Sequence, residues 1–116
     1  MIFSSEIKNN IIIETVNLKR ASTNEAEKFR SHFLNNLNGK VKGYIIDLTA
    51  CEYMDSSFLG SIIFIYKKIS ESGRELKLVV LHQDIKILLE ITSVNKFVGI
   101  FETKKAAIKS FNKKTI

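Results

Sequence analysis

Short apolar runs separated by polar turns open the chain. Residues 2–7 and 11–16 have the composition of strands, and the polar segment 8–10 lies between them. This arrangement predicts a β-hairpin. A further short strand around Leu18 is predicted to continue the second strand of the hairpin.

Three later runs predict strands that are buried in a sheet. GYIIDL at residues 43–48 and LKLVVL at 76–81 are apolar on both faces, and FVGIF at 97–101 follows the same type. Strands that alternate with helical segments indicate an α/β fold with a mixed, mainly parallel sheet and about four helices. The hairpin would add an antiparallel edge. Nothing within residues 1–116 marks a boundary, so we expect a single domain.

Helical spacing of apolar residues fills the segments between these strands. A helix is predicted over residues 23–37, with the capping-box pair Ser22 and Glu25 at its start and Gly39 as its C-terminal glycine. Further helices are predicted from the residues after Asp55 to a stop at Gly73, over residues 84–91 and over residues 104–112.

The sequence Asp55-Ser56-Ser57 stands at the start of the most apolar helix. Asp55 is predicted to be the N-cap, so Ser56 and Ser57 would occupy the first turn beside free N–H groups and the positive end of the helix dipole. A phosphate on Ser56 would add about −1.5 to −2 charges there without disturbing the fold.

Apolar residues occupy more than one face of the helix that follows Asp55. Leu59, Ile62, Ile63 and Tyr66 are predicted to pack on the sheet, with Phe58 and Ile65 flanking them and Phe64 pointing away. Phe64 can be read as covered by a neighbouring helix or singly exposed. Alternatively, Phe58, Phe64 and Ile65 form a partner surface beside the serines.

Charge and composition narrow the class of protein. The net charge is +6, and the late lysines Lys105, Lys109 and Lys113 recur on the face opposite Ile108. This is typical of a solvated helix face, with an anionic partner as the alternative. The single cysteine, Cys51, excludes an internal disulfide, and no run is long enough to span a membrane. We therefore expect a cytoplasmic location.

Motifs for catalysis are missing from the sequence. His32 and His82 lack the spacing of metal ligands, no base accompanies the serines, and neither a P-loop nor a dinucleotide fingerprint is present. We predict no enzyme activity, no cofactor and no direct contact with nucleic acid.

The segment YIIDLTACEYMDSSFLGSIIFIYKKISESG resembles the central part of the STAS domain, named for sulphate transporters and anti-sigma factor antagonists. The family has a buried strand ending in Asp, a short loop and Asp-Ser-Ser-Gly-Leu-Gly opening a helix. LVVLHQDIKILLEITSVNKFVGIFET is similar to the following strand, short helix and last strand. The resemblance extends over roughly residues 10–112.

What this resemblance implies is a bacterial anti-sigma factor antagonist. The free form would bind a serine kinase that also acts as the anti-sigma factor, phosphorylation would release it, and a serine phosphatase would restore it. Ser56 would be the phosphate acceptor, Asp55 would position it, and Ser57 and the turn from Phe58 to Gly60 would lie in the kinase contact.

Two departures from the family pattern bear on the partner. Phe58 replaces the usual glycine, and VNLKRAS at residues 16–22 stands where a Gly-Glu-Leu-Asp-like stretch is expected. A bulky Phe58 would narrow kinase access. It motivates a second hypothesis, a structural or transport-associated STAS subunit without a phosphoswitch. A third, a small basic nucleic-acid binder, rests on the late lysines alone.

Overall fold

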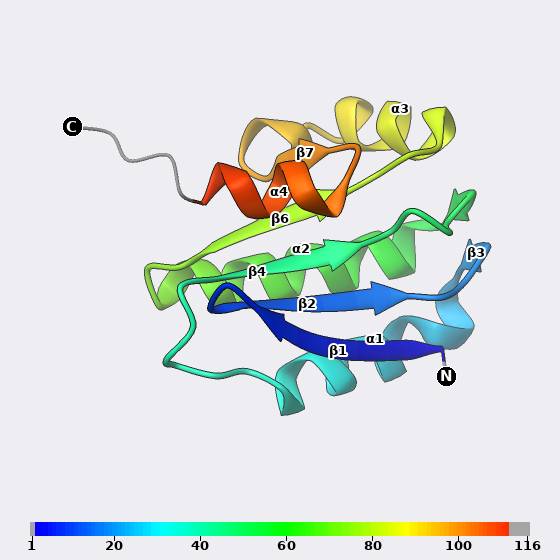
Figure 1. Cartoon of the computed structure of the whole chain (residues 1–116). Helices are drawn as coiled ribbons and strands as arrows, with labels where there is room; N and C mark the ends of the chain where they lie inside the picture. Colours follow the sequence, from blue (N-terminus) through cyan, green and yellow to red (C-terminus); the bar gives the residue numbers. More distant parts are fainter. Residues whose placement is uncertain (1, 112–116) are drawn as a thin grey trace.

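A five-stranded mixed sheet forms the centre of the computed structural model, which describes residues 2–111 (Figure 1). The strand order is β1-β2-β4-β6-β7; β1 is antiparallel to β2 and the other neighbours are parallel. The strands are β1 (Phe3–Lys8), β2 (Ile11–Val16), β4 (Gly43–Asp47), β6 (Glu75–Val79) and β7 (Gly99–Phe101). The predicted α/β class and the antiparallel edge are confirmed.

Helices cover both faces of this sheet. In Figure 1, α1 and α2 lie together behind it and α4 crosses in front. The large core lies on the α1 and α2 face and also takes Ile85 and Leu89 from α3, whereas a smaller core lies under α4. The helices are α1 (Thr23–Asn35), α2 (Ser56–Glu71), α3 (Gln83–Ile91) and α4 (Lys104–Ser110), with a 3₁₀ turn, η1 (Val94–Lys96).

A separate two-stranded sheet was not expected from the sequence. β3 (Arg20–Ala21) pairs in parallel with β5 (Tyr53–Met54), and the N–H of Asp55 donates to the carbonyl of Ala21 at 3.0 Å. The strand predicted around Leu18 as a continuation of β2 is therefore wrong. The two short strands instead bring the start of α2 beside the start of α1.

Several predicted helix and strand ends shift by a few residues. α1 ends at Asn35 with Asn36 as its C-cap, so Leu37 is exposed and Gly39 is not the C-terminal glycine. Gly73 does follow the end of α2, with a φ of 78° that glycine adopts without strain. The residues beyond position 111, which include Lys113, lie outside the described part of the chain.

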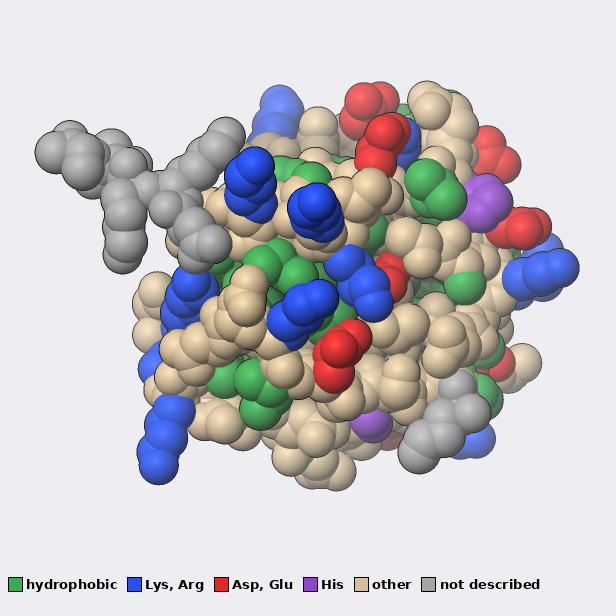
Figure 2. All heavy atoms as spheres, viewed as in Figure 1, with side chains coloured by type: hydrophobic (Ala, Val, Ile, Leu, Met, Phe, Trp, Pro, Cys, Tyr) green, Lys and Arg blue, Asp and Glu red, His purple; other side chains and the backbone are tan. Residues whose placement is uncertain are grey.

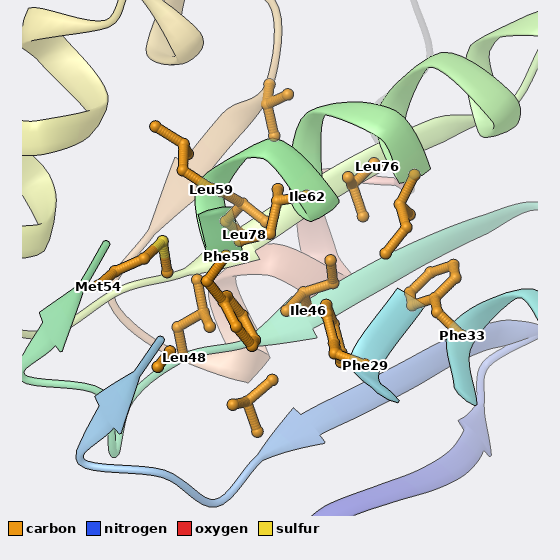
Figure 3. Close-up of a cluster of buried hydrophobic side chains, with 14 of the residues drawn as sticks. Phe29, Phe33, Ile46, Leu48, Met54, Phe58, Leu59, Ile62, Leu76 and Leu78 are labelled. Atoms are coloured by element: carbon orange, nitrogen blue, oxygen red, sulfur yellow. The ribbon is translucent and has the colours of Figure 1, made fainter. Parts of the chain in front are cut away.

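Phe58 points into the large core and not toward a partner. Its side chain is 0% exposed and stacks on Phe29 with 5.0 Å between ring centroids. Figure 3 shows the two rings side by side among core residues of α1, α2 and the sheet. Ile65, two turns along α2, is also 0% exposed. The predicted partner roles of Phe58 and Ile65 are therefore wrong, because α1 covers the side of α2 that carries them.

Close packing on the other face of the sheet fixes the end of α4. A Cβ built on Gly43 would lie 2.2 Å from the ring of Phe111. Only glycine leaves room for this ring against the start of β4, so the position explains why a buried strand begins with glycine.

Replacing Phe58 with alanine tests the packing of α1 on α2. We expect Phe58→Ala to lower the free energy of unfolding by about 3–5 kcal/mol, because a buried aromatic ring is lost from a dense core. Urea unfolding followed by circular dichroism measures the change. Phe64→Ala on the exposed side of α2 is the control and should cost about 1 kcal/mol or less. Equal costs for the two variants would contradict the assigned orientation of α2.

Candidate functional site

Asp55 holds the N-termini of two helices together. As the N-cap of α2 it accepts, at Oδ1, the N–H of Phe58 at 3.0 Å. Its other oxygen, Oδ2, accepts the N–H of Thr23, the first residue of α1, at 2.8 Å and lies 3.0 Å from Thr23 Oγ1. One carboxylate therefore caps two helices whose positive dipole ends would otherwise repel each other.

The capping box predicted for α1 is present, but the start of α1 also bonds to Asp55 through Thr23. Glu25 accepts the N–H and the hydroxyl of Ser22 at 3.1 and 3.0 Å, as the sequence suggested. Thr23 is the residue that sequence reasoning missed. It lies 32 positions before Asp55, and no local signal relates the two residues. A threonine one position after an N-cap is an ordinary helix start, so only the fold identifies its partner.

Hydrogen bonds lower the pKa of the Asp55 carboxyl. The N–H of Phe58 has the largest effect. Desolvation, the next largest, acts in the opposite direction, but the backbone and hydroxyl of Thr23 and the backbone of Ser57 add to the lowering, so the pKa stays below its usual value. Asp55 is therefore a carboxylate at neutral pH. Its negative charge balances the two helix ends.

The two serines after Asp55 differ in their surroundings. Ser57 Oγ lies 3.1 Å from Thr23 Oγ1, so it belongs to the joint between the helices. Ser56 is exposed, and no other residue between positions 2 and 111 forms a hydrogen bond with its hydroxyl. Of the two hydroxyls, the one on Ser56 is the freer to react or to meet another molecule.

An exposed stripe runs from these serines along α2. Ser56, Gly60 and Phe64 recur every four residues and all three are exposed, so they share one face of the helix. The guanidinium of Arg30 on α1 lies 5.3 Å from the centre of the Phe64 ring, and Lys68 Nζ lies 5.7 Å from it. We call Ser56, Ser57, Gly60 and Phe64 the serine stripe.

Gly60 is not required by the fold. A Cβ built on it meets no atom within 4 Å, although glycine inside a helix costs roughly 0.5–1 kcal/mol relative to alanine. Packing within the chain therefore does not explain why this position lacks a side chain. A molecule approaching the α2 backbone would benefit from the missing side chain.

Cys51, in the loop before β5, does not add chemistry to the site. Its side chain is buried, its Sγ donates to the carbonyl of Tyr53 at 3.1 Å, and burial raises the pKa of the thiol. Cys51 is therefore a small buried residue of the core. In the described range 2–111, no group of His, Cys, Asp or Glu side chains is arranged to hold a metal ion.

The comparison with protein families identifies the class. Residues 6–107 match the STAS domain, and the chain belongs to this family. The match covers both the central segment that carries the serines and the later strands. None of the helices in residues 2–111 has both the length and the apolar character needed to cross a membrane.

Solved structures with the same fold come from different kinds of protein. A Thermotoga maritima protein described as an anti-sigma factor antagonist is 26% identical, with a TM-score of 0.88 over 96% of this chain and 95% of its own. The Bacillus cell fate determinant SpoIIAA in its phosphorylated form is 14% identical, with a TM-score of 0.71 over 93% and 97% of the two chains.

The same fold also occurs within a transporter. The murine anion transporter Slc26a9 matches 89% of this chain with 18% of its own, at 14% identity and a TM-score of 0.79. The similarities at 14% identity establish the fold alone. The fold therefore occurs both as most of a small chain and as about a fifth of a much longer one.

The pH dependence of stability tests the role of Asp55. Because its pKa is lower in the folded state than in the unfolded chain, its carboxylate stabilises the fold above the pKa of an unfolded aspartate, about 3.9. That stabilisation is lost as the pH falls through the folded pKa. We expect Asp55→Asn to lower the urea midpoint at pH 6, and the difference from the wild type to shrink below about pH 4.

Urea titrations between about pH 3 and pH 7 measure this difference. Glu52→Gln, which removes an exposed carboxylate just before β5, is the control for a general change of charge. A deficit of Asp55→Asn that stays constant across the whole range would contradict the capping role of the ionised carboxylate.

Proposed function

We propose that this protein is a regulatory module similar to anti-sigma factor antagonists, switched by phosphorylation of Ser56. In this proposal the free form binds a serine-kinase anti-sigma factor in the cytoplasm, and ATP-dependent phosphorylation of Ser56 ends the complex. A serine phosphatase would restore the free form. The chain itself would carry no catalytic residue and no cofactor.

The observation that carries the proposal is the free, exposed hydroxyl of Ser56 at the joint of two helix N-termini. A phosphate there would lie at the positive ends of two helix dipoles, which offset its repulsion from Asp55, the residue that already accepts the N–H groups of Thr23 and Phe58. The description of the Bacillus protein in a phosphorylated form supports the view that this fold tolerates phosphate. The similarity to the Thermotoga protein supports the same class.

The partner surface in this proposal is the serine stripe together with Asp55. Phe64 supplies an aromatic contact with the cations of Arg30 and Lys68 near its ring, and Gly60 allows close approach of the partner backbone. A phosphate buried in such a contact without a counter-charge would cost several kcal/mol, and each 1.4 kcal/mol is about tenfold in affinity. One modification could therefore abolish docking while the fold stays intact.

A second candidate function is a structural or transport-associated subunit without a phosphoswitch. The match to part of a murine anion transporter favours it. The sequence argument for it was the bulk of Phe58, but this side chain is buried and does not obstruct Ser56. The two candidates differ in one measurable property, because only the phosphoswitch makes binding depend on Ser56.

Phosphorylation by the cognate kinase tests the proposal. As the candidate kinase we would take an anti-sigma factor encoded beside this chain in its source genome. With ATP, we expect one phosphate on Ser56 by mass spectrometry, and at least about a hundredfold weaker binding of the phosphorylated form in calorimetry. Ser56→Ala should bind the kinase and accept no phosphate. Ser57→Ala, the matched control, should still be phosphorylated.

Two results together would exclude the phosphoswitch. They are the absence of phosphate on Ser56 and an unchanged kinase affinity of Ser56→Asp. A stable complex with a transporter that ignores Ser56 substitutions would favour the second candidate.

Gly60→Ala separates binding from stability. We expect this variant to raise the free energy of unfolding by about 0.5–1 kcal/mol, because the added methyl group meets open space and alanine favours the helix. The same methyl group should weaken kinase binding by about tenfold if the partner lies against the α2 backbone. Ser70→Ala, near the far end of α2, is the control for binding. If the variant is more stable and binds the kinase with unchanged affinity, Gly60 does not lie in the contact.

A further inference from the structure

A hollow lined by lysines lies on the face of the sheet opposite α1 and α2. It is formed between the β1–β2 hairpin and α4 and has a volume of about 570 Å³. Figure 2, which shows this face, has Lys and Arg side chains gathered around exposed hydrophobic side chains at α4. Sites for small molecules commonly have volumes of about 300–1,000 Å³.

Positive charge dominates the rim of this hollow. Lys8 comes from the hairpin and Lys104, Lys105 and Lys109 come from α4, while Glu6 is the one carboxylate among the lining residues that the structure describes. Glu6 is already paired, since its Oε2 lies 3.5 Å from Lys104 Nζ. Within residues 2–111 the other three lysines of the rim form no ion pair.

The arrangement of these lysines is unfavourable without a counter-charge between them. Lys105 and Lys109 lie one turn apart on α4, and like charges at this spacing repel each other. Lys8 is held beside them by a tight turn in which Asn9 and Asn10 have φ values of 54° and 64°. Two such residues are typical of a hairpin turn whose twist matches the strands. A bound anion would relieve the repulsion.

The floor of the hollow is apolar. Ile13 from β2 and Ile108 from α4 lie beneath it in the small core under α4, with 1% and 8% of their surfaces exposed, so the methylene stems of the lysines supply much of its apolar surface. Isoleucine gives an anion nothing to bind, so the floor favours a ligand that also has an apolar part. Among residues 2–111, none that lines the hollow has an aromatic ring on which a base could stack, which disfavours single-stranded nucleic acid.

We propose that this hollow binds a small, soluble anionic amphiphile, with a phosphate or carboxylate head and an apolar body. The head lies among Lys8, Lys105 and Lys109, and the body lies against the methylene stems of the lysines and the exposed edge of Ile108. The site shares no residue with the serine stripe, so it is independent of the proposed phosphoswitch.

Nuclear magnetic resonance titration of the full chain with octyl phosphate, below its micelle concentration, tests this proposal. We expect saturable shifts of the amides of Asn9, Ile13, Lys105 and Ile108, and no shift at Ser56. Inorganic phosphate tests the apolar body, and octyl trimethylammonium tests the charge. Each should bind at least about tenfold more weakly than octyl phosphate.

Paired substitutions locate the charge that matters. Lys105→Gln with Lys109→Gln should weaken octyl phosphate binding by about fivefold, because two partly exposed ion pairs are lost. Lys67→Gln with Lys68→Gln on α2 makes the same change of net charge and should alter the affinity by less than about twofold. Urea midpoints no lower than that of the wild type show that both variants retain the fold.

Four outcomes would overturn the proposal. The first is an equal affinity for inorganic and octyl phosphate, and the second is an equal loss of affinity in the two double variants. The third is binding to vesicles of anionic phospholipid without binding of soluble octyl phosphate. The fourth is binding of a single-stranded oligonucleotide without binding of soluble octyl phosphate.

Discussion

One carboxylate sets the geometry of this surface. Two helices that start side by side direct their free N–H groups and positive dipole ends into the same small space, which is unfavourable unless an acceptor with negative charge lies between them. Asp55 provides both, through 3.0 and 2.8 Å hydrogen bonds to the first turns of α2 and α1. The positions of the neighbouring serines follow from this contact.

The helical period then separates the roles of three successive residues. Ser57 faces the joint and contacts Thr23, Phe58 turns into the core against Phe29, and Ser56 is left exposed. The buried ring of Phe58 anchors the first turn of α2. The position of Ser56 therefore does not depend on contacts made by its own side chain. A change at this hydroxyl therefore acts on the surface while the scaffold under it keeps its packing.

The sequence predicted what depends on local pattern. Buried strands such as β4, the stop at Gly73 and the N-cap Asp55 were all identified, because period, glycine conformation and capping chemistry act within a few residues. The orientation of Phe58 and Ile65 was not. A helical wheel gives the apolar faces but not which neighbour covers them, and α1 buries a side of α2 that looked available.

Contacts between distant segments escaped prediction for a related reason. β3 and β5 have two residues each, too few for a period, and their pairing joins positions 20–21 with 53–54. That pairing brings Thr23 to Asp55. The hydrogen bond between these two residues therefore depends on strands too short to be recognised in the sequence. Here short strands act as positioning devices, and their importance lies in what they align and not in the area that they bury.

The sheet separates two surfaces that differ in kind. On the α1 and α2 face, charge is balanced and a free hydroxyl is presented; on the α4 face, lysines surround an apolar floor and positive charge is left unpaired. β2 contributes to both cores, with Ile12 on one face and Ile13 on the other. A closely packed strand of this kind deforms little, so events on one surface are expected to leave the other unchanged. The fold can therefore carry a switched protein contact and a small anion site without either one constraining the other.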